Sequence, residues 1–279
     1  MSGRMVAVHY IESGAGTPLV LLHAFPVDAR MWNPLRGRLE EQARVITPDQ
    51  RGLGESSLDG STARGMLEAP VGKLPVDRPS VDVAAADILE LLDQLELPRV
   101  VLGGCSMGGY VATAVLRAAP QRVAGLLLVD TKAPADTDEQ RANRLSVATR
   151  AEEEGISGWL ADSMLPNLLS ASTRERRPEV VEELRALIEA QPADGVAWAQ
   201  RAMAARPDSF VALRAFGGPA MVVVGAEDSI TPPSAAREMV DALPRGELVE
   251  LAGSGHLPSM ESPEALADAV LPWLAGIEV

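Results

Sequence analysis

Short apolar runs recur along the chain and alternate with segments of helical periodicity. The runs of strand length cover residues 6–11, 19–22, 45–47, 100–102, 123–129, 220–225 and 247–251. Those without any polar residue are typical of strands covered on both faces. Segments with helical spacing or helix-start signals cover residues 32–39, 80–95, 107–119, 233–243 and 262–274. The alternation predicts an α/β fold with a doubly wound, mostly parallel sheet.

Two stretches depart from this alternation. Residues 135–216 are charged, alanine-rich and helical, so we expect them to form a helical insertion. The expected domain division is therefore a core of residues 1–134 and 217–279, interrupted by this insertion. Residues 58–79 carry glycine, proline and mixed charges with little periodicity, which predicts a long irregular loop.

The acidic composition restricts the expected partners. The 279 residues carry a formal net charge of −14 and give a pI near 4.7. Nucleic acids and anionic membranes bind basic surfaces, so neither is expected as a partner. A single cysteine excludes a disulfide framework and fits the reducing cytoplasm. Residues 1–6 contain no hydrophobic signal region, and no apolar run has the length of a membrane span. We expect a cytoplasmic protein.

A glycine-lined corner follows the run at residues 100–102. Gly104, Ser106 and Gly108 match the pattern G-x-S-x-G, with a strand before it and a helix after it, as the pattern requires. In such a corner the serine adopts a strained backbone conformation, and glycines avoid collisions with it. The N-terminus of the following helix favours negative charge that develops beside the serine.

Other glycine-rich turns fit this corner less well. A phosphate-binding loop of the Walker type needs a lysine at the helix start, and a dinucleotide-binding turn needs G-x-G-x-x-G. The corner has neither feature. If Cys105 were the nucleophile, Met107 would occupy the position of the closing glycine. The spacing therefore selects Ser106.

Three histidines compete for the role of general base. His9 lies in the first predicted strand and His23 closes the second, whereas His256 follows the last strand in a loop with two glycines. Ligands of parallel sheets bind beyond the carboxyl ends of the strands, where His256 and Ser106 are both expected. An acid is needed to orient the imidazole, and Asp228 follows the preceding strand.

The order Ser106, Asp228, His256 along the chain is that of α/β-hydrolase triads. Glu227 is adjacent to Asp228, and Asp130 ends an earlier strand, so each remains an alternative acid. On these motifs, nearly the whole chain resembles the α/β-hydrolase family of serine hydrolases. Within that family it is most similar to small carboxylesterases, oxoadipate-type enol-lactonases and cofactor-free haloperoxidases.

The resemblance implies further roles. Segment 23–26, His-Ala-Phe-Pro, resembles the family's histidine–glycine loop with alanine in place of the usual glycine, and implies that the Phe25 amide lines an oxyanion hole. The second donor would be the amide of Met107. Residues 135–216 resemble the family's cap domain. The segment at residues 49–56 matches another family turn, which we expect to be structural.

The expected activity is hydrolysis of a small ester or lactone through an acyl-enzyme on Ser106, with no metal or other cofactor. The same triad also allows perhydrolysis or hydrolysis of a carbon–carbon bond. A ligand-binding protein on a hydrolase fold is the non-enzymatic alternative. The side chains expected to contact a small-molecule substrate are His23, Trp159, Met164, Trp198 and Arg201, and Arg206 is a further candidate for a substrate carboxylate.

Overall fold

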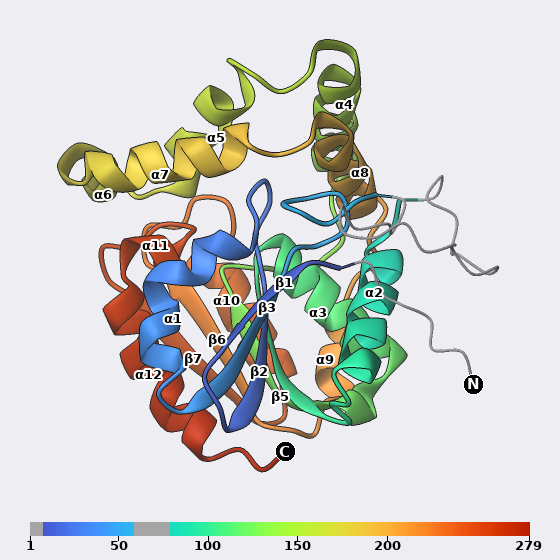
Figure 1. Cartoon of the computed structure of the whole chain (residues 1–279), viewed down its shortest axis with the longest axis vertical. Coiled ribbons are helices and arrows are strands. Elements are labelled where there is room, and N and C mark those ends of the chain that lie inside the picture. The colour runs from blue at the N-terminus through green and yellow to red at the C-terminus, as the bar shows by residue number, and fades with distance from the viewer. Residues whose placement is uncertain (1–7, 59–78) are drawn as a thin grey trace.

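A seven-stranded sheet forms the centre of the computed structural model, which describes residues 8–58 and 79–279 (Figure 1). The strands are β1 (Tyr10–Ser13), β2 (Thr17–Leu22), β3 (Ala43–Pro48), β4 (Val100–Cys105), β5 (Val123–Val129), β6 (Ala220–Gly225) and β7 (Gly246–Leu251). They lie in the order β1-β3-β2-β4-β5-β6-β7, and β1 is antiparallel to β3 whereas the other neighbouring strands are parallel. The predicted doubly wound, mostly parallel sheet is confirmed.

The central strands are the apolar runs of the sequence. Every residue of β4, β5 and β6 is buried, as expected for strands covered on both faces. From β2 the chain passes to β3 on one side and then to β4 on the other. Leu22 at the end of β2 pairs with Gly104 near the end of β4. The loops after these two strands therefore lie next to each other at the switch point, where open parallel sheets bind ligands.

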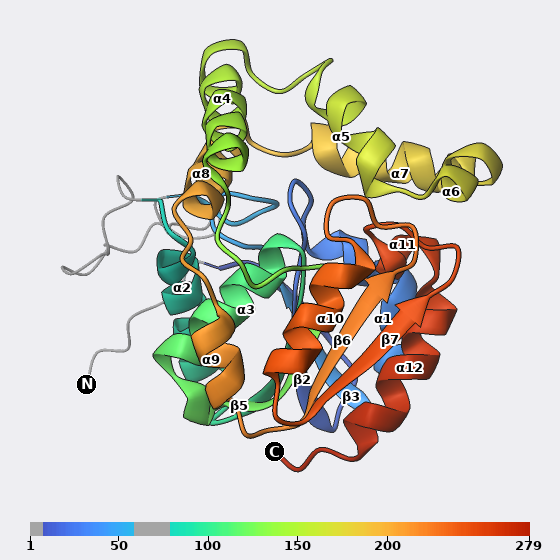
Figure 2. The same cartoon turned by 180° about the vertical axis from the view of Figure 1, so that it is seen from behind.

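Helices cover both faces of the sheet (Figures 1 and 2). The core helices are η1 (Ala29–Trp32), α1 (Asn33–Leu39), α2 (Val81–Gln94), α3 (Met107–Ala118), η2 (Pro120–Arg122), α9 (Phe210–Ala215), α10 (Pro233–Ala242), α11 (Pro258–Glu261) and α12 (Pro263–Ala275). Helix α1 packs against α12, and α2 packs against α3. In the described part of the chain, no helix combines the length and the apolar character needed to cross a membrane.

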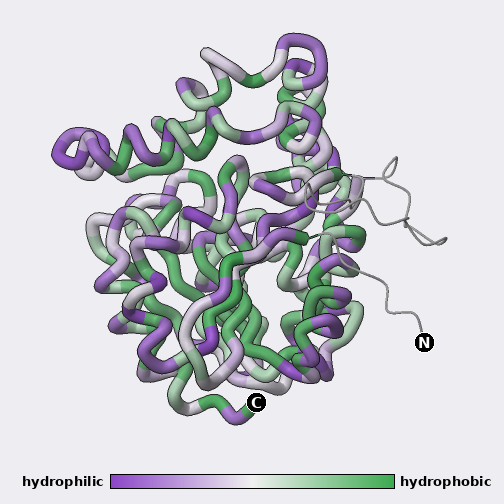
Figure 3. The backbone as a smooth tube through the Cα atoms, viewed as in Figure 1, coloured by the Kyte–Doolittle hydropathy of each residue, from purple (hydrophilic) through white to green (hydrophobic). Residues whose placement is uncertain are grey.

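Five helices lie over one end of the sheet, and we call them the insertion helices (Figure 1). They are α4 (Asp138–Glu154), α5 (Leu160–Leu168), α6 (Ala171–Arg176), α7 (Pro178–Glu189) and α8 (Ala193–Ala204). Helix α4 packs against α8, while α5 and α6 pack against α7. The next helix, α9, contacts α3 and α10 in the core instead. Figure 3 shows apolar segments concentrated in the central sheet and hydrophilic segments spread over the outer helices and loops, including the outer ends of the insertion helices.

Two sequence predictions differ in detail from the structure. The first strand of the described residues is Tyr10–Ser13, the segment that pairs with β3, so it ends two residues later than predicted; residues 6 and 7 of the predicted strand lie outside the described residues. Ser262 occupies the position before α12, but its side chain makes no capping hydrogen bond. In contrast, the Ser80 side chain accepts a hydrogen bond from the Asp82 amide and caps α2 as predicted. Most of the predicted loop at residues 58–79 lies outside the described residues.

The turn at residues 49–56 is held together by one buried carboxylate. Asp49 accepts hydrogen bonds from the His9 ring at 2.8 Å, from the Ala29 amide at 2.8 Å and from the Glu55 amide at 2.9 Å. A Cβ atom on Gly54 would lie 2.4 Å from the Asp49 carboxylate, so only glycine fits there. These contacts give the turn and His9 the structural role that the sequence predicts.

Candidate active site

Ser106 stands on a sharp bend between β4 and α3. Its backbone has φ 52° and ψ −112°, a conformation that non-glycine residues rarely adopt. A Cβ atom on Gly104 would lie 2.2 Å from the backbone of Gly108, and one on Gly108 would lie 2.2 Å from the Leu22 carbonyl oxygen. The two glycines therefore let the start of α3 approach both its own strand and β2. The bend has the geometry of a nucleophile elbow.

His256 and Asp228 form a buried hydrogen-bonded pair. The distance from His256 Nδ1 to Asp228 Oδ2 is 2.8 Å. The amides of Ile230 and Thr231 donate to Asp228 Oδ1 at 2.8 and 3.1 Å, and the Thr231 hydroxyl donates to Oδ2 at 2.6 Å. Burial opposes the charge of Asp228, but the His256 hydrogen bond and charge outweigh it and lower the pKa of this carboxyl to about 2. The ionised carboxylate fixes the imidazole with its Nδ1 proton inward, which leaves Nε2 as the basic nitrogen.

The His256 loop lies against the nucleophile elbow. The Cys105 sulfur is 3.6 Å from the His256 carbonyl oxygen, so the residue before Ser106 contacts the residue that carries the imidazole. Among the hydrogen bonds of the described residues, none joins the Ser106 hydroxyl to His256. In unliganded enzymes this bond is often long or misaligned and forms when substrate binds.

Asp130, the alternative acid, lies beside the pair but binds the backbone of β6. Its Oδ1 accepts a hydrogen bond from the Gly225 amide at 2.8 Å, while its Oδ2 receives none. Burial and the nearby charge of Asp228 raise the pKa of the Asp130 carboxyl well above its ordinary value. The raised pKa favours the neutral form of Asp130, so this carboxyl is a poorer partner for the imidazole than Asp228. Glu227, the other alternative, is exposed to solvent.

Within the described residues, Asp130, Asp228 and His256 form a cluster that could hold a metal ion. One ligand atom each from Asp130, Asp228 and His256 lies within 4.8 Å of the others. However, His256 Nδ1 and Asp228 Oδ2 are hydrogen-bonded to each other, and burial raises the pKa of Asp130 and so disfavours its charged form. A divalent cation would require both of these arrangements to break. The donor set therefore fits an acid–base pair better than a metal site.

The amides predicted to form the oxyanion hole are those of Met107 and Phe25. The Met107 amide opens α3, and the Phe25 amide lies in the loop after β2. Within the described residues neither amide donates a hydrogen bond, whereas the amides of Gly109 and Tyr110 both donate to the Ser106 carbonyl oxygen. Unpaired amides on two adjacent loops can form an oxyanion hole.

His23 is part of the support for this loop. It is fully buried, and its Nδ1 donates to the Ala24 carbonyl oxygen at 2.8 Å while its Nε2 accepts from the Gln50 amide at 2.8 Å. Burial lowers the pKa of His23, so the ring is neutral. Both nitrogens are thus occupied by the chain. The structure does not leave His23 free to contact a substrate as the sequence suggested, because its ring holds the loop after β2 to the turn after β3.

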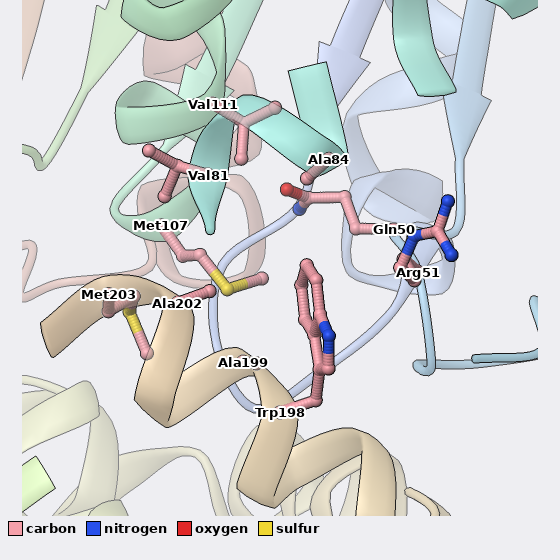
Figure 4. Close-up of a pocket in the computed structure, with 10 residues that line it drawn as sticks. All are labelled: Gln50, Arg51, Val81, Ala84, Met107, Val111, Trp198, Ala199, Ala202 and Met203. Carbon is pink, nitrogen blue, oxygen red and sulfur yellow. The ribbon is translucent and has the colours of Figure 1, made fainter. Parts of the chain in front are cut away.

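A small apolar pocket lies beside the elbow (Figure 4). Its lining comes from the turn after β3, from α2 and α3, and from the insertion helix α8; the residues are Gln50, Arg51, Val81, Ala84, Met107, Val111, Trp198, Ala199, Ala202 and Met203. Figure 4 shows the Trp198 ring projecting from α8 toward Gln50. Arg51 is the charged group in the lining, and its guanidinium is paired with Asp87. The pocket therefore offers mainly apolar surface next to the residue that follows Ser106.

A sequence model of the Alpha/beta hydrolase family matches residues 19–269. The chain belongs to this family. It is therefore an enzyme of the hydrolase class, as the sequence motifs predicted. The match spans both parts of the core and the insertion helices between them.

Several characterised proteins are similar to this hydrolase over nearly their whole length. A thermophilic esterase from Thermogutta terrifontis, solved with malate bound, is 39% identical with a TM-score of 0.86, over 96% of this chain and 93% of that one. The enol-lactonase from Burkholderia xenovorans LB400 is 28% identical with a TM-score of 0.82, over 96% of each chain. A candidate non-heme bromoperoxidase of Mycobacterium tuberculosis, BpoC, is 25% identical over 98% of this chain and 100% of its own.

The four insertion residues that the sequence predicts as substrate contacts lie in different surroundings. Trp198 lines the pocket. Trp159 instead donates from its ring nitrogen to the Gly155 carbonyl oxygen, and Arg150 stacks on its ring at 4.2 Å. Arg201 pairs with Glu152 and so joins α8 to α4. Met164 is half-buried and packs against the apolar core. Of these four, only Trp198 is seen at the pocket.

Arg206 is also engaged within the hydrolase. Its guanidinium lies 2.8 Å from Asp136 and stacks on the Tyr110 ring at 3.9 Å. Arg144 and Lys132 pair with the same aspartate at 2.5 and 3.3 Å. This buried cluster fastens the insertion to the core at its entry and exit. The Arg206 side chain is buried in this cluster, so a substrate carboxylate in solution does not reach it.

Some residues of the site could be recognised only weakly, or not at all, from the sequence. Thr231 supports Asp228, and a hydroxyl three positions after the acid is a signal that local turn chemistry could have revealed. Gln50 holds the His23 backbone through a 2.7 Å hydrogen bond, although a glutamine in a turn is ordinarily solvated. Glu261 is buried below the His256 loop despite its charge. Such contacts join positions far apart in the chain, so local patterns do not reveal them.

Proposed function

We propose that this hydrolase cleaves a small ester or lactone through an acyl-enzyme on Ser106, with His256 as the base and Asp228 as its partner. The observation that carries this proposal is the buried 2.8 Å hydrogen bond from His256 to Asp228, on a loop that contacts Cys105 beside the strained serine. Thiol attack by Cys105 is disfavoured, because burial raises its pKa well above the ordinary value.

The reaction proceeds in two stages. His256 Nε2 accepts the Ser106 proton while the serine oxygen bonds to the carbonyl carbon, and the resulting oxyanion binds the amides of Phe25 and Met107. His256 then protonates the departing alcohol oxygen as the carbon–oxygen bond breaks. In the second stage, water gives a proton to His256 and attacks the acyl-enzyme, and Ser106 regains its proton as the acid leaves. Each oxyanion donor contributes about 3 kcal/mol to lowering the barrier.

The pocket favours an uncharged acyl or alcohol group. Met107, Trp198 and Met203 provide its bulky lining, and Arg51 is neutralised by Asp87. The insertion helices α4–α8 are proposed to act as the cap, since α8 supplies one wall of this pocket. The similarity to an esterase and to an enol-lactonase supports ester and lactone carbonyls as the reacting groups.

Perhydrolysis is a second candidate activity, supported by the similarity to BpoC. In that reaction hydrogen peroxide takes the place of water, attacks the acyl carbon and leaves with it as a peracid. The acyl-enzyme on Ser106 is common to both reactions, so the active-site geometry suits either nucleophile.

The test measures hydrolysis of p-nitrophenyl esters of increasing acyl length and of simple lactones, with and without hydrogen peroxide. We expect hydrolysis of uncharged esters, a loss of at least about 10³-fold in Ser106→Ala and retained activity in Cys105→Ala. Peracid formation with peroxide would add the second activity. Wild-type turnover in Ser106→Ala would overturn the proposal.

A further inference from the structure

Glu261 is a buried acid that the proposed mechanism does not use. It ends α11, the short helix after the His256 loop, and is 7% exposed. Figures 1 and 2 both show α11 below the end of the insertion that contains α5, α6 and α7. A carboxylate removed from water destabilises a fold unless hydrogen bonds compensate, so its partners indicate its role.

One carboxylate oxygen of Glu261 binds the chain on both sides of the proposed base. The Gly255 amide donates to Oε1 at 2.9 Å, and the Leu257 amide donates to the same oxygen at 3.3 Å. These two residues flank His256. The position of this oxygen therefore sets the path of the backbone that carries the imidazole.

The second oxygen of Glu261 binds the insertion. The Ser170 amide, just before α6, donates to Oε2 at 2.8 Å. The Ser170 hydroxyl also lies 3.3 Å from the Gly253 carbonyl oxygen, and Arg177 donates to the Glu261 carbonyl oxygen at 2.7 Å. A Cβ atom on Gly255 would lie 2.5 Å from the Ser170 nitrogen, which shows how closely the two segments approach.

We propose that Glu261 is a positioning residue that joins the α5–α6 segment of the insertion to the His256 loop and thereby orients the imidazole toward Ser106. This inference rests on the proposed function, since it takes His256 as the base. A carboxylate suits the position because each of its two oxygens accepts from a different segment. A glutamine has a single acceptor oxygen, and its NH₂ group would face one of the donating amides.

The first test compares Glu261→Gln with the control Glu264→Gln, which changes an exposed glutamate in the first turn of α12. We expect kcat on a p-nitrophenyl ester to fall about tenfold to a hundredfold in Glu261→Gln, because small displacements of a catalytic group slow the chemical step strongly. KM should change by less than about twofold, since the pocket is lined by α8 and not by α5 or α6. The rate of labelling by a fluorophosphonate should fall with kcat. Glu264→Gln should behave as the wild type.

A second pair of variants tests the link without altering Glu261. Ser170 has φ −58° and follows Leu169 in an extended conformation, so the backbone angles there are those that a proline requires. Ser170→Pro removes the amide that donates to Glu261, whereas Ser170→Ala keeps that amide and removes only the hydroxyl. We expect a lower kcat and slower labelling in Ser170→Pro than in Ser170→Ala. This comparison decides the matter if Glu261→Gln does not fold, as judged by circular dichroism.

The outcomes separate this inference from the function on which it rests. If wild type fails to label, or Ser106→Ala labels equally well, the proposed function is wrong and the inference falls with it. If wild type labels at Ser106 and folded Glu261→Gln has the wild-type kcat and labelling rate, the positioning role is overturned and the function stands. Equal rates in Ser170→Pro and Ser170→Ala would likewise overturn it. A rise in KM with an unchanged kcat would also contradict the positioning role.

Discussion

Two aspartates follow neighbouring strands of the sheet, and their pKa values shift in opposite directions. Asp130 follows β5 and Asp228 follows β6, and both are buried near His256. Asp228 accepts hydrogen bonds from two amides, a hydroxyl and the imidazole, and its pKa is lowered to about 2. Asp130 receives a single amide, and burial raises its pKa well above the ordinary value. Burial and the charge of Asp228 thus disfavour the charged form of Asp130, whereas the hydrogen bond and charge of His256 favour the charged form of Asp228.

The strongest test of this comparison is Asp228→Asn. An asparagine cannot stabilise the charged imidazole and can bind its wrong tautomer, so we expect kcat to fall by about 10⁴-fold on any accepted ester. The exposed neighbour variant Glu227→Gln should retain the wild-type kcat. A small loss in Asp228→Asn would mean that Asp130 takes over as the acid, contrary to the account.

The stability of the fold at acidic pH tests the lowered pKa of Asp228. Asp228 has a pKa of about 2 when folded and an ordinary value of 3.8, so its stabilisation is complete above pH 4 and is lost as the pH falls toward 2. We expect this group to contribute about 2 kcal/mol to the pH dependence of unfolding in that range. Urea titrations at several pH values would show a flatter profile in Asp228→Asn. An unchanged profile would contradict the lowered pKa.

Asp130→Asn should have a smaller effect, with the opposite sign for stability. An amide imitates the neutral acid, because its oxygen can accept from Gly225 and its NH₂ can donate to Asp228, so kcat should stay within about threefold of wild type. The folded state holds the Asp130 proton above pH 3.8 while the unfolded state releases it, so the native residue costs stability as the pH rises. Thermal melts should therefore give a higher Tm for the variant at pH 7 than for wild type, with less difference at pH 4. A kcat loss as large as that of Asp228→Asn would refute the assignment.

The smallest expected effect lies far from the two aspartates. Arg201 pairs with Glu152 on a partly exposed surface, where such pairs contribute less than about 1 kcal/mol. Arg201→Ala should therefore leave unchanged the ratio of kcat/KM between esters with and without a remote carboxylate. A selective loss on carboxylate-bearing esters would place Arg201 at the substrate after all.

Much of the fold was predictable because the central strands are buried on both faces. The run at residues 123–129 forms β5 with the predicted ends, since an uninterrupted apolar stretch suits no other environment in this sheet. The edge strand Tyr10–Ser13 was displaced in the prediction because its limits depend on pairing with β3, which is a long-range contact. Ser106 was recognisable because its constraints are local, as the close approach at Gly104 and Gly108 shows.

The rest of the candidate site depends on contacts that local patterns do not encode. The choice between Asp130 and Asp228 required knowing which carboxylate reaches His256 Nδ1. Trp159 and Arg201 had the right chemistry for substrate contact, but Trp159, in the turn before α5, and Arg201, on α8, both contact α4 instead. Their orientation follows from how the insertion helices pack on one another.

Trapping the acyl-enzyme tests the central claim most directly. The enzyme would be mixed with a slowly hydrolysed ester, quenched in acid, and examined by intact-mass spectrometry and peptide mapping. We predict a mass increase of one acyl group, located on the peptide that contains Ser106 and absent from Ser106→Ala. Turnover with no adduct, or an adduct on another residue that persists in Ser106→Ala, would contradict the account.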